Sequence, residues 1–294
     1  MPSPEHESIV AMLSSAPIIE SPDLATQRSG FEAMTAEFPL APGTEVLSTH
    51  ADDVPVEWVT AEGADGQKVM LYLHGGGYVI GSAATHRSLA SRLSEASAAK
   101  VLVVDYRLAP EHPFPAAVED ALTTYRWALS QGLHADKMAI AGDSAGGGLA
   151  LALLVRIREE GLPMPACGIC LSPWVDLEGT GATSAPGVVN DPMVTLAGIQ
   201  GMAEAYAGGQ LNAPLASPLH ADLSGLPPLL IQVGTREILL DDARRIASKA
   251  RAAGVSVTLQ EEEGLIHVWQ LFPNVPESHQ AVARIGAFVA RELT

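Results

Sequence analysis

The chain has 294 residues, of which 47% are hydrophobic and 17% are charged, and these proportions exclude a disordered protein. Its 34 acidic residues outnumber 17 basic ones, and the formal charge of −17 disfavours nucleic acid or an anionic lipid surface as a partner, because like charges repel. No apolar run reaches the roughly 18 residues of a membrane-spanning helix and the first 30 residues lack a secretory pattern, so we expect a cytoplasmic protein without membrane insertion.

The first 45 residues precede any clear strand signal. Helical spacing of apolar residues is present at 7–13 and at 23–38, where Phe31 and Met34 share a face. Because this segment lies before the sheet begins, we expect residues 1–45 to form a cap segment that packs over another part of the molecule.

From residue 46 onward, apolar runs alternate with amphipathic stretches. Parallel strands need long crossovers and are buried on both faces, so this alternation predicts an α/β fold with a mostly parallel sheet between layers of helices. We assign one catalytic domain to residues 46–177 and 227–294. The predicted strands are 54–60, 69–73, 101–104, 138–141, 168–171, 229–233 and 255–260, and the predicted helices are 86–98, 116–131, 145–160, 241–253 and 276–293.

Residues 178–226 interrupt the alternation. They are rich in Gly, Ala and Pro, and only 195–206 has a helical pattern. Connections of this length in compact domains commonly form lids or binding elements, so we expect a cap insertion here.

A triple glycine follows the predicted strand 69–73, in the sequence His74–Gly77. Consecutive glycines allow backbone N–H groups to converge on one point, which is the property of an oxyanion hole. We expect the amides of Gly76, Gly77 and Ala145 to form it, with His74 bracing the loop. A plain flexible turn is one alternative. A phosphate loop is disfavoured because neither Lys-Ser/Thr nor GxGxxG spacing is present.

The sequence GDSAGG at 142–147 lies between a predicted strand and a predicted helix. This is the context of a nucleophile elbow, and it makes Ser144 the candidate nucleophile; the alternative is a glycine-rich turn that only opens a helix. A serine hydroxyl is a weak nucleophile and needs a neighbouring base. The sequence therefore has to supply a histidine and an acid at the same edge of the sheet.

Of nine histidines, His267 best suits the order serine, acid, histidine, because it follows the last predicted strand. The flanks of His6, His50, His134 and His279 predict solvated surface positions, while His86, His112 and His220 have no obvious partner.

The acid is predicted to follow the strand 229–233. Glu237 is nearest to the strand end and is our first choice, with Asp241 as the alternative; Asp241 and Asp242 are also placed to begin a helix, where negative charge is favourable. The acid would hold the imidazole tautomer and stabilise the imidazolium.

The only two cysteines, Cys167 and Cys170, lie in a predicted buried strand, where positions three apart point to opposite faces. With no second ligand pair for zinc, we interpret both as core residues and expect no metal site.

Four motifs in this order resemble the hormone-sensitive-lipase-like esterases, or bacterial family IV: HGGGY at 74–78, DYRLAPEHPFPA at 105–116, GDSAGG at 142–147 and GLIHVW at 264–269. The resemblance runs from about residue 50 to the end. It implies an α/β-hydrolase fold with an eight-stranded sheet, a helical cap and no metal or organic cofactor. Many members carry Asp-Pro-Leu where this chain has Glu237, Ile238 and Leu239, and matching the motif gives the acid role to Glu237.

Together these features predict a serine carboxylesterase that hydrolyses short-chain carboxylic esters through an acyl-enzyme, with a small-molecule ester as its partner. The short acyl chain is implied by the family resemblance only. A lactone or amide hydrolase with the same triad, or a non-catalytic ligand-binding protein on this scaffold, is the alternative. The sequence leaves open the substrate-binding residues and the oligomeric state, a homo-oligomer included.

Overall fold

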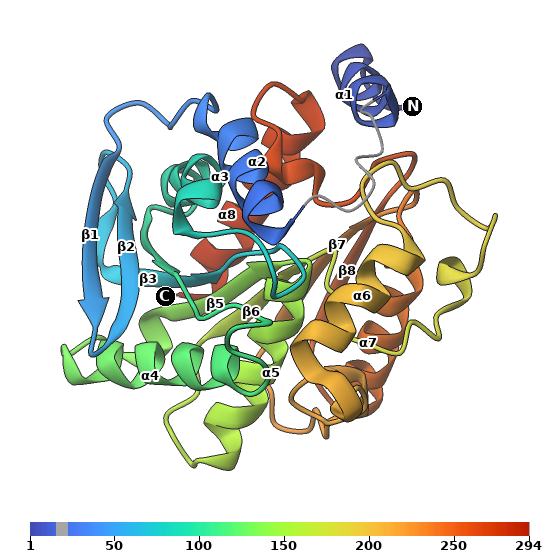
Figure 1. Ribbon diagram of the computed structural model, residues 1–294. Coiled ribbons are helices and arrows are strands. Elements are labelled where there is room, and N and C mark those ends of the chain that lie inside the picture. The colour runs from blue at the N-terminus through green and yellow to red at the C-terminus, as the bar shows by residue number, and fades with distance from the viewer. Residues whose placement is uncertain (16–22, 294) are drawn as a thin grey trace.

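A single eight-stranded sheet forms the centre of the molecule (Figure 1), and the computed structural model describes residues 1–15 and 23–293. The strand order is β1-β2-β4-β3-β5-β6-β7-β8; β2 runs antiparallel to both of its neighbours, β1 and β4, and every later pairing is parallel. This confirms the predicted mostly parallel α/β-hydrolase sheet. The strands are β1 (Glu45–Ala51), β2 (Val54–Thr60), β3 (Asp65–Leu73), β4 (Ala99–Val104), β5 (Met138–Asp143), β6 (Cys167–Leu171), β7 (Leu229–Gly234) and β8 (Val257–Glu262).

Helices cover both faces of the sheet. One face packs against α4, α5 and α7, and the other against α3 and α8. The described helices are α1 (Pro4–Ser15), α2 (Leu24–Ala36), α3 (Ala83–Ser97), α4 (Ala116–Ser130), α5 (Ala145–Glu159), α6 (Leu196–Ala207), α7 (Leu240–Ala252) and α8 (Pro276–Glu292).

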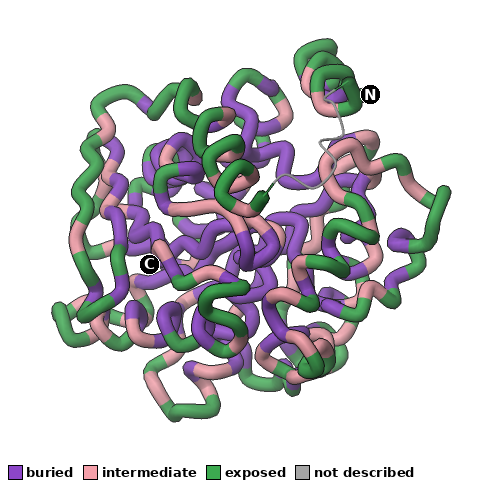
Figure 2. The backbone as a smooth tube through the Cα atoms, viewed as in Figure 1, coloured by how far each residue is buried: buried purple, intermediate pink, exposed green. Residues whose placement is uncertain are grey.

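Burial explains the continuous apolar runs of the central strands. In β3, Leu71 and Leu73 belong to the core on one face, whereas Met70 and Tyr72 belong to the core on the other. A strand covered on both faces has no reason to alternate apolar with polar residues. Figure 2 shows this buried interior surrounded by more exposed helices and loops.

The two cysteines of β6 point to opposite faces of the sheet, as predicted from their spacing. Cys167 packs in one core and Cys170 in the other, and both are free thiols. Burial raises the pKa of each thiol to about 12, so both are protonated at neutral pH.

Strand β1 was not predicted. Five of its seven residues are exposed, because it is the edge strand and pairs only with β2. The alternating burial that marks most strands in a sequence is therefore missing. Smaller differences occur at element ends: α3 begins earlier than expected because the Ser82 hydroxyl caps it by accepting from the Thr85 amide.

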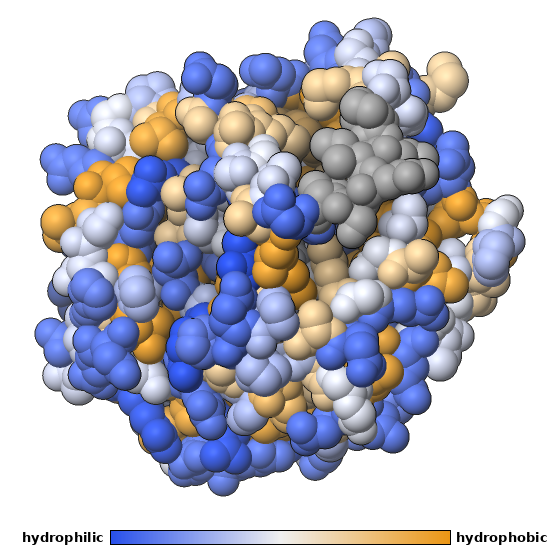
Figure 3. Space-filling view, in the orientation of Figure 1, coloured by the Kyte–Doolittle hydropathy of each residue, from blue (hydrophilic) through white to orange (hydrophobic). Residues whose placement is uncertain are grey.

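The face seen in Figure 3 is mainly hydrophilic, with hydrophobic residues scattered between hydrophilic ones. Among the described residues, no helix combines the length and the apolar character needed to cross a membrane.

Candidate active site

Ser144 lies in a sharp turn between β5 and α5. Its backbone has φ +53° and ψ −121°, which a residue with a Cβ adopts only under strain. The turn is held by the Ser144 amide, which donates to Leu171 O at 2.8 Å, and by Ser144 O, which accepts from the Trp174 amide at 2.9 Å. Glycine is required beside it, because a Cβ at Gly146 would collide with the carbonyl of Leu73.

The triple-glycine loop follows β3 at the same edge of the sheet. Gly76 and Gly77 have φ of +114° and +62°, a region that favours glycine. The carboxylate of Asp143 ties the loop to the elbow by accepting from the Gly75 amide at 3.0 Å. The side chain of Met202, from α6, approaches Gly77 so closely that a Cβ there would have no room.

His74 helps to hold the glycine loop in place through contacts with Gly75 and Tyr106. Its ring stacks on Tyr106 with centroids 4.2 Å apart, its Nδ1 lies 2.8 Å from Gly75 O, and the Tyr106 hydroxyl donates to His74 O at 2.6 Å. Burial, assisted by the nearby His86, lowers the pKa of His74 to about 3, so the ring is neutral.

His86, for which the sequence offered no partner, has one in the structure. Its Nε2 lies 3.3 Å from Asp143 Oδ1, the oxygen that also accepts from the Tyr72 hydroxyl at 2.8 Å. Burial alone would raise the pKa of Asp143, but His86 and Tyr72 lower it below its ordinary value. A charged carboxylate therefore anchors the glycine loop.

His267 and Glu237 are brought together from the loops after β8 and β7. His267 Nδ1 lies 2.8 Å from Glu237 Oε2, and both side chains are buried. Because a carboxylate only accepts, Nδ1 carries the proton and leaves Nε2 as an acceptor. Asp241, the alternative acid, instead accepts from the Ala182 amide at 2.9 Å and pairs with Arg245 at 3.1 Å.

The electrostatics of this pair follow from burial and charge. Burial raises the pKa of Glu237, with the hydrogen bonds from His267 and Gly234 opposing it. Burial would lower the pKa of His267, but the hydrogen bond to Glu237 and its negative charge outweigh that effect, so the pKa lies above its ordinary value.

Sequence reasoning missed Ser172. Its hydroxyl donates to Glu237 Oε1 at 2.9 Å and accepts from the Val268 amide at 3.2 Å, so it joins the acid to the histidine loop. The position of Ser172 in the sequence could have indicated it. Ser172 is a polar residue directly after the buried strand β6, at the edge of the sheet where the other site residues lie.

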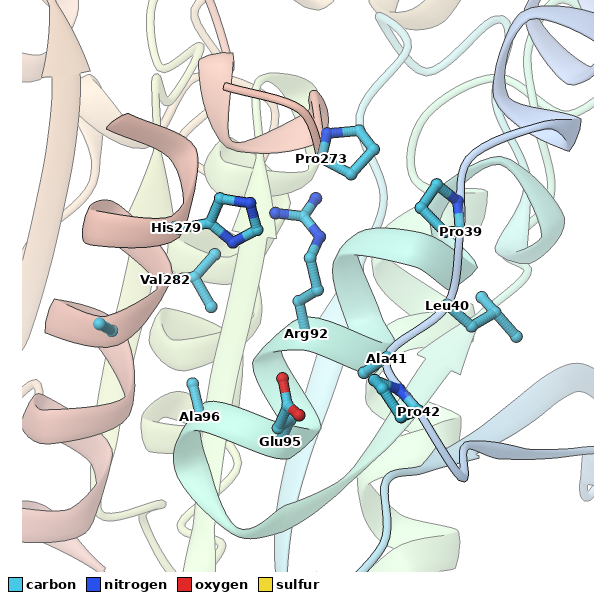
Figure 4. Close-up of a pocket in the computed structure, with 11 residues that line it drawn as sticks. Pro39, Leu40, Ala41, Pro42, Arg92, Glu95, Ala96, Pro273, His279 and Val282 are labelled. Atoms are coloured by element: carbon cyan, nitrogen blue, oxygen red, sulfur yellow. The ribbon is translucent and has the colours of Figure 1, made fainter. Parts of the chain in front are cut away.

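His267 lies in a loop that is held from two sides. On its carboxyl side, Arg92 of α3 donates to Gln270 O at 2.7 Å and to Leu271 O at 3.3 Å. Figure 4 shows the Arg92 guanidinium between His279 and Pro273, beside a hollow of about 320 Å³. Burial lowers the pKa of Arg92 to about 10, and the side chain remains charged at neutral pH.

The expectation that His6 is a solvated surface residue was wrong. His6 is fully buried, and its Nε2 accepts from the Ile266 amide at 3.3 Å on the other side of the histidine loop. The acidic residues that flank His6 suggested an exposed helix, but it is the face of α1 carrying His6 and Val10 that is buried.

One pocket of about 390 Å³ brings the predicted residues together. Ser144, His267, Gly76 and Gly77 all line it, whereas Ala145 is fully buried and does not line it. Two parts of its wall come from α2 and from 193–202, coloured blue and gold in Figure 1. The lining is mainly apolar, and includes Phe31, Met34, Ile80, Met193, Val194, Ile199, Met202, Val268 and Leu271.

Comparisons with known proteins show the family to which this chain belongs. The family model described as the alpha/beta hydrolase fold matches residues 70–271. An acetyl-hydrolase of Streptomyces hygroscopicus is 46% identical over 250 residues, covering 84% of this chain and 82% of the relative. The chain belongs to the α/β-hydrolase family.

Within that α/β-hydrolase family, the solved structures place it among the bacterial hormone-sensitive-lipase esterases. The structure of an esterase from that group matches all of both chains, with a TM-score of 0.97 and 46% identity. EstE5, solved after its crystal was soaked with p-nitrophenyl butyrate, matches 99% of both chains with a TM-score of 0.95 and 45% identity.

Proposed function

We propose that this α/β hydrolase cleaves carboxylic esters with short acyl chains through an acyl-enzyme on Ser144. The observation that carries the proposal is the hydrogen bond of 2.8 Å between the buried Glu237 and His267, because His267 lines the same pocket as Ser144 and the glycine loop. A pure binding protein has no need for such a pair. The relatives named esterase and acetyl-hydrolase support the same reaction.

The proposed first step forms the acyl-enzyme. His267 Nε2 takes the Ser144 proton as Oγ attacks the ester carbon, and the negative charge moves onto the carbonyl oxygen. The amides of Gly76, Gly77 and Ala145 bind that oxygen; one such donor typically contributes about 10²- to 10³-fold in rate. The intermediate then collapses, and the protonated imidazole gives its proton to the leaving alkoxide.

In the second step, His267 removes a proton from water as the water attacks the acyl carbon. The new intermediate expels Ser144 Oγ, which recovers the proton, and the carboxylic acid leaves. Throughout, Glu237 keeps the imidazole oriented and stabilises its positive form.

The pocket favours a neutral, apolar acyl group. Its described lining contains neither lysine nor arginine, so nothing there would pair with an anionic substrate. Methionines 34, 193 and 202 offer flexible apolar walls that adapt to different chains. The p-nitrophenyl butyrate used with EstE5 has an acyl group of this class.

We propose that residues 1–45 and 178–226 form the cap. The support is that α2 and the stretch 193–202 both contribute walls of the pocket. Residues 16–22 of the first segment lie outside the described residues.

The test is hydrolysis of p-nitrophenyl butyrate by Ser144→Ala. We expect kcat to fall by several orders of magnitude with an unchanged circular-dichroism spectrum, because the nucleophile is lost and the fold is kept. Ser130→Ala, at the exposed end of α4, is the matched control and should keep full activity. Near-normal turnover by Ser144→Ala would refute the proposal.

A further inference from the structure

Helix α1 reaches the loop that carries His267. His6 has no exposed surface, and its Nε2 accepts from the backbone amide of Ile266, the residue directly before His267. An acceptor nitrogen carries no proton, so the neutral ring is protonated at Nδ1, which lies 3.6 Å from Glu7 Oε1. Burial lowers the pKa of His6, with Glu7 and Glu277 opposing and Arg236 reinforcing the shift. The ring therefore remains an acceptor at neutral pH.

The next residue of α1 reaches the loop of the acid. Glu7 pairs with Arg236 at 3.1 Å, and Arg236 directly precedes Glu237. The Arg236 amide also donates to Leu265 O at 3.0 Å, which joins the acid loop to the histidine loop. Two consecutive residues of one helix thus contact both loops, each one position before the functional side chain.

Helix α1 is itself anchored to the body of the molecule, although Figure 1 shows it at the periphery. The Ser3 amide and hydroxyl donate to the two carboxylate oxygens of Glu277, at 2.6 and 2.8 Å, in the first turn of α8. The Ser3 hydroxyl in turn accepts from the His6 amide at 3.2 Å. Val10, one helical step further along, packs in the core beside the sheet. His6 is therefore held at a fixed position.

We propose that His6 is a positioning residue for the general base: its neutral ring fixes the Ile266 peptide and so sets the direction of the His267 side chain toward Glu237 and the pocket. The ring does not itself line the pocket that holds Ser144. Without it the buried Ile266 amide loses its acceptor and the loop shifts to find another. The inference rests on the proposed function, since it assigns His267 the role of base.

The test compares two replacements of His6. His6→Leu fills the space without an acceptor, and His6→Gln offers a carboxamide oxygen where Nε2 lies. For His6→Leu we expect kcat on p-nitrophenyl butyrate to fall about 10- to 100-fold with little change in KM, the loss expected for a misplacement of about 1 Å. The acid limb of kcat/KM should also move to lower pH, because a looser contact with Glu237 lowers the pKa of His267.

His6→Gln should restore most of the wild-type kcat and most of the wild-type acid limb of kcat/KM. If His6 only filled space, this recovery would not be expected. His50→Leu, at an exposed position of β1, is the matched control and should change neither kcat nor the acid limb of kcat/KM. If His6→Leu does not fold, His6→Asn carries the same readouts, because its shorter carboxamide fits the space but does not reach Ile266.

An NMR titration of the His267 ring separates this inference from the proposed function, because it needs no turnover. A wild-type protein without esterase activity would refute the proposed function, yet the ring titration would still decide the role of His6. A lowered His267 pKa in the leucine or asparagine variant, recovered in the glutamine variant, supports the proposal. An unchanged His267 pKa in a folded variant overturns it.

Discussion

At the scale of single residues, the proposed chemistry depends on which carboxylate holds His267. Glu237 is buried against the ring, whereas Asp241 faces the insertion and Arg245. A base must be neutral to accept a proton, and the pKa of His267 lies above its ordinary value of 6.5. Activity should therefore be lost as the pH falls through a midpoint above 6.5.

Comparing Glu237→Gln with Asp241→Asn tests this assignment. Glu237→Gln should reduce kcat by about 10³- to 10⁴-fold, because an amide does not enforce the correct tautomer or stabilise the imidazolium. Its remaining activity should show an acid limb at lower pH, since the negative charge that raises the pKa of His267 is gone. The measurement is the pH profile of kcat/KM. Asp241→Asn should keep the wild-type kcat and the wild-type pH profile. A severe loss of activity in that variant alone would contradict the assignment of Glu237 as the acid.

Residues with local motifs could be predicted, and residues defined by distant contacts could not. Ser144 and the glycines stand in short patterns whose backbone demands are readable from the sequence, and His267 follows from chain order. Ser172 meets its partner Glu237 across 65 positions, and His6 meets Ile266 across 260. No local pattern marks such pairs, because the fold creates them.

At the scale of elements, α6 lies over the glycine loop and limits the pocket. Met202 contacts the Gly77 region and lines the pocket with Ile199 and Val194. We propose that the acyl group of the substrate lies against the Met202 side chain. The chain length accepted by the enzyme should therefore depend on residue 202.

Met202→Ala should raise kcat/KM for p-nitrophenyl octanoate relative to the butyrate by roughly tenfold, because each added methylene finds apolar space. The ratio of the two substrates is the measurement, since a general effect on the oxyanion loop cancels in it. Met164→Ala, outside the pocket, serves as the control. An unchanged ratio in Met202→Ala would mean that the acyl chain lies elsewhere.

The order of elements was predictable because buried parallel strands leave continuous apolar runs and their crossover helices leave an amphipathic period. Edge strand β1 was missed for the opposite reason: its side chains Val46 and Leu47 are exposed, and only one neighbour constrains it. The shape of the pocket could not be predicted from the sequence either, since α2 and α6 are brought to it by tertiary packing alone.

At the scale of the whole molecule, the site is an assembly of segments far apart in the chain. The elbow comes from β5, the glycine loop from β3, the acid from the β7 loop and the base from the β8 loop. Parallel strands in the order β3-β5-β6-β7-β8 bring their carboxyl ends to one edge, which explains the convergence. One serine should therefore be far more reactive than all the others.

Covalent labelling with phenylmethylsulfonyl fluoride, followed by peptide mass mapping, tests that convergence most directly. Ser144 Oγ should displace fluoride and carry the sulfonyl group, with activity lost in proportion to labelling. Glu237→Gln should label much more slowly, and Ser144→Ala should not label at this site. Labelling of a different serine, or loss of activity with Ser144 unmodified, would contradict the account.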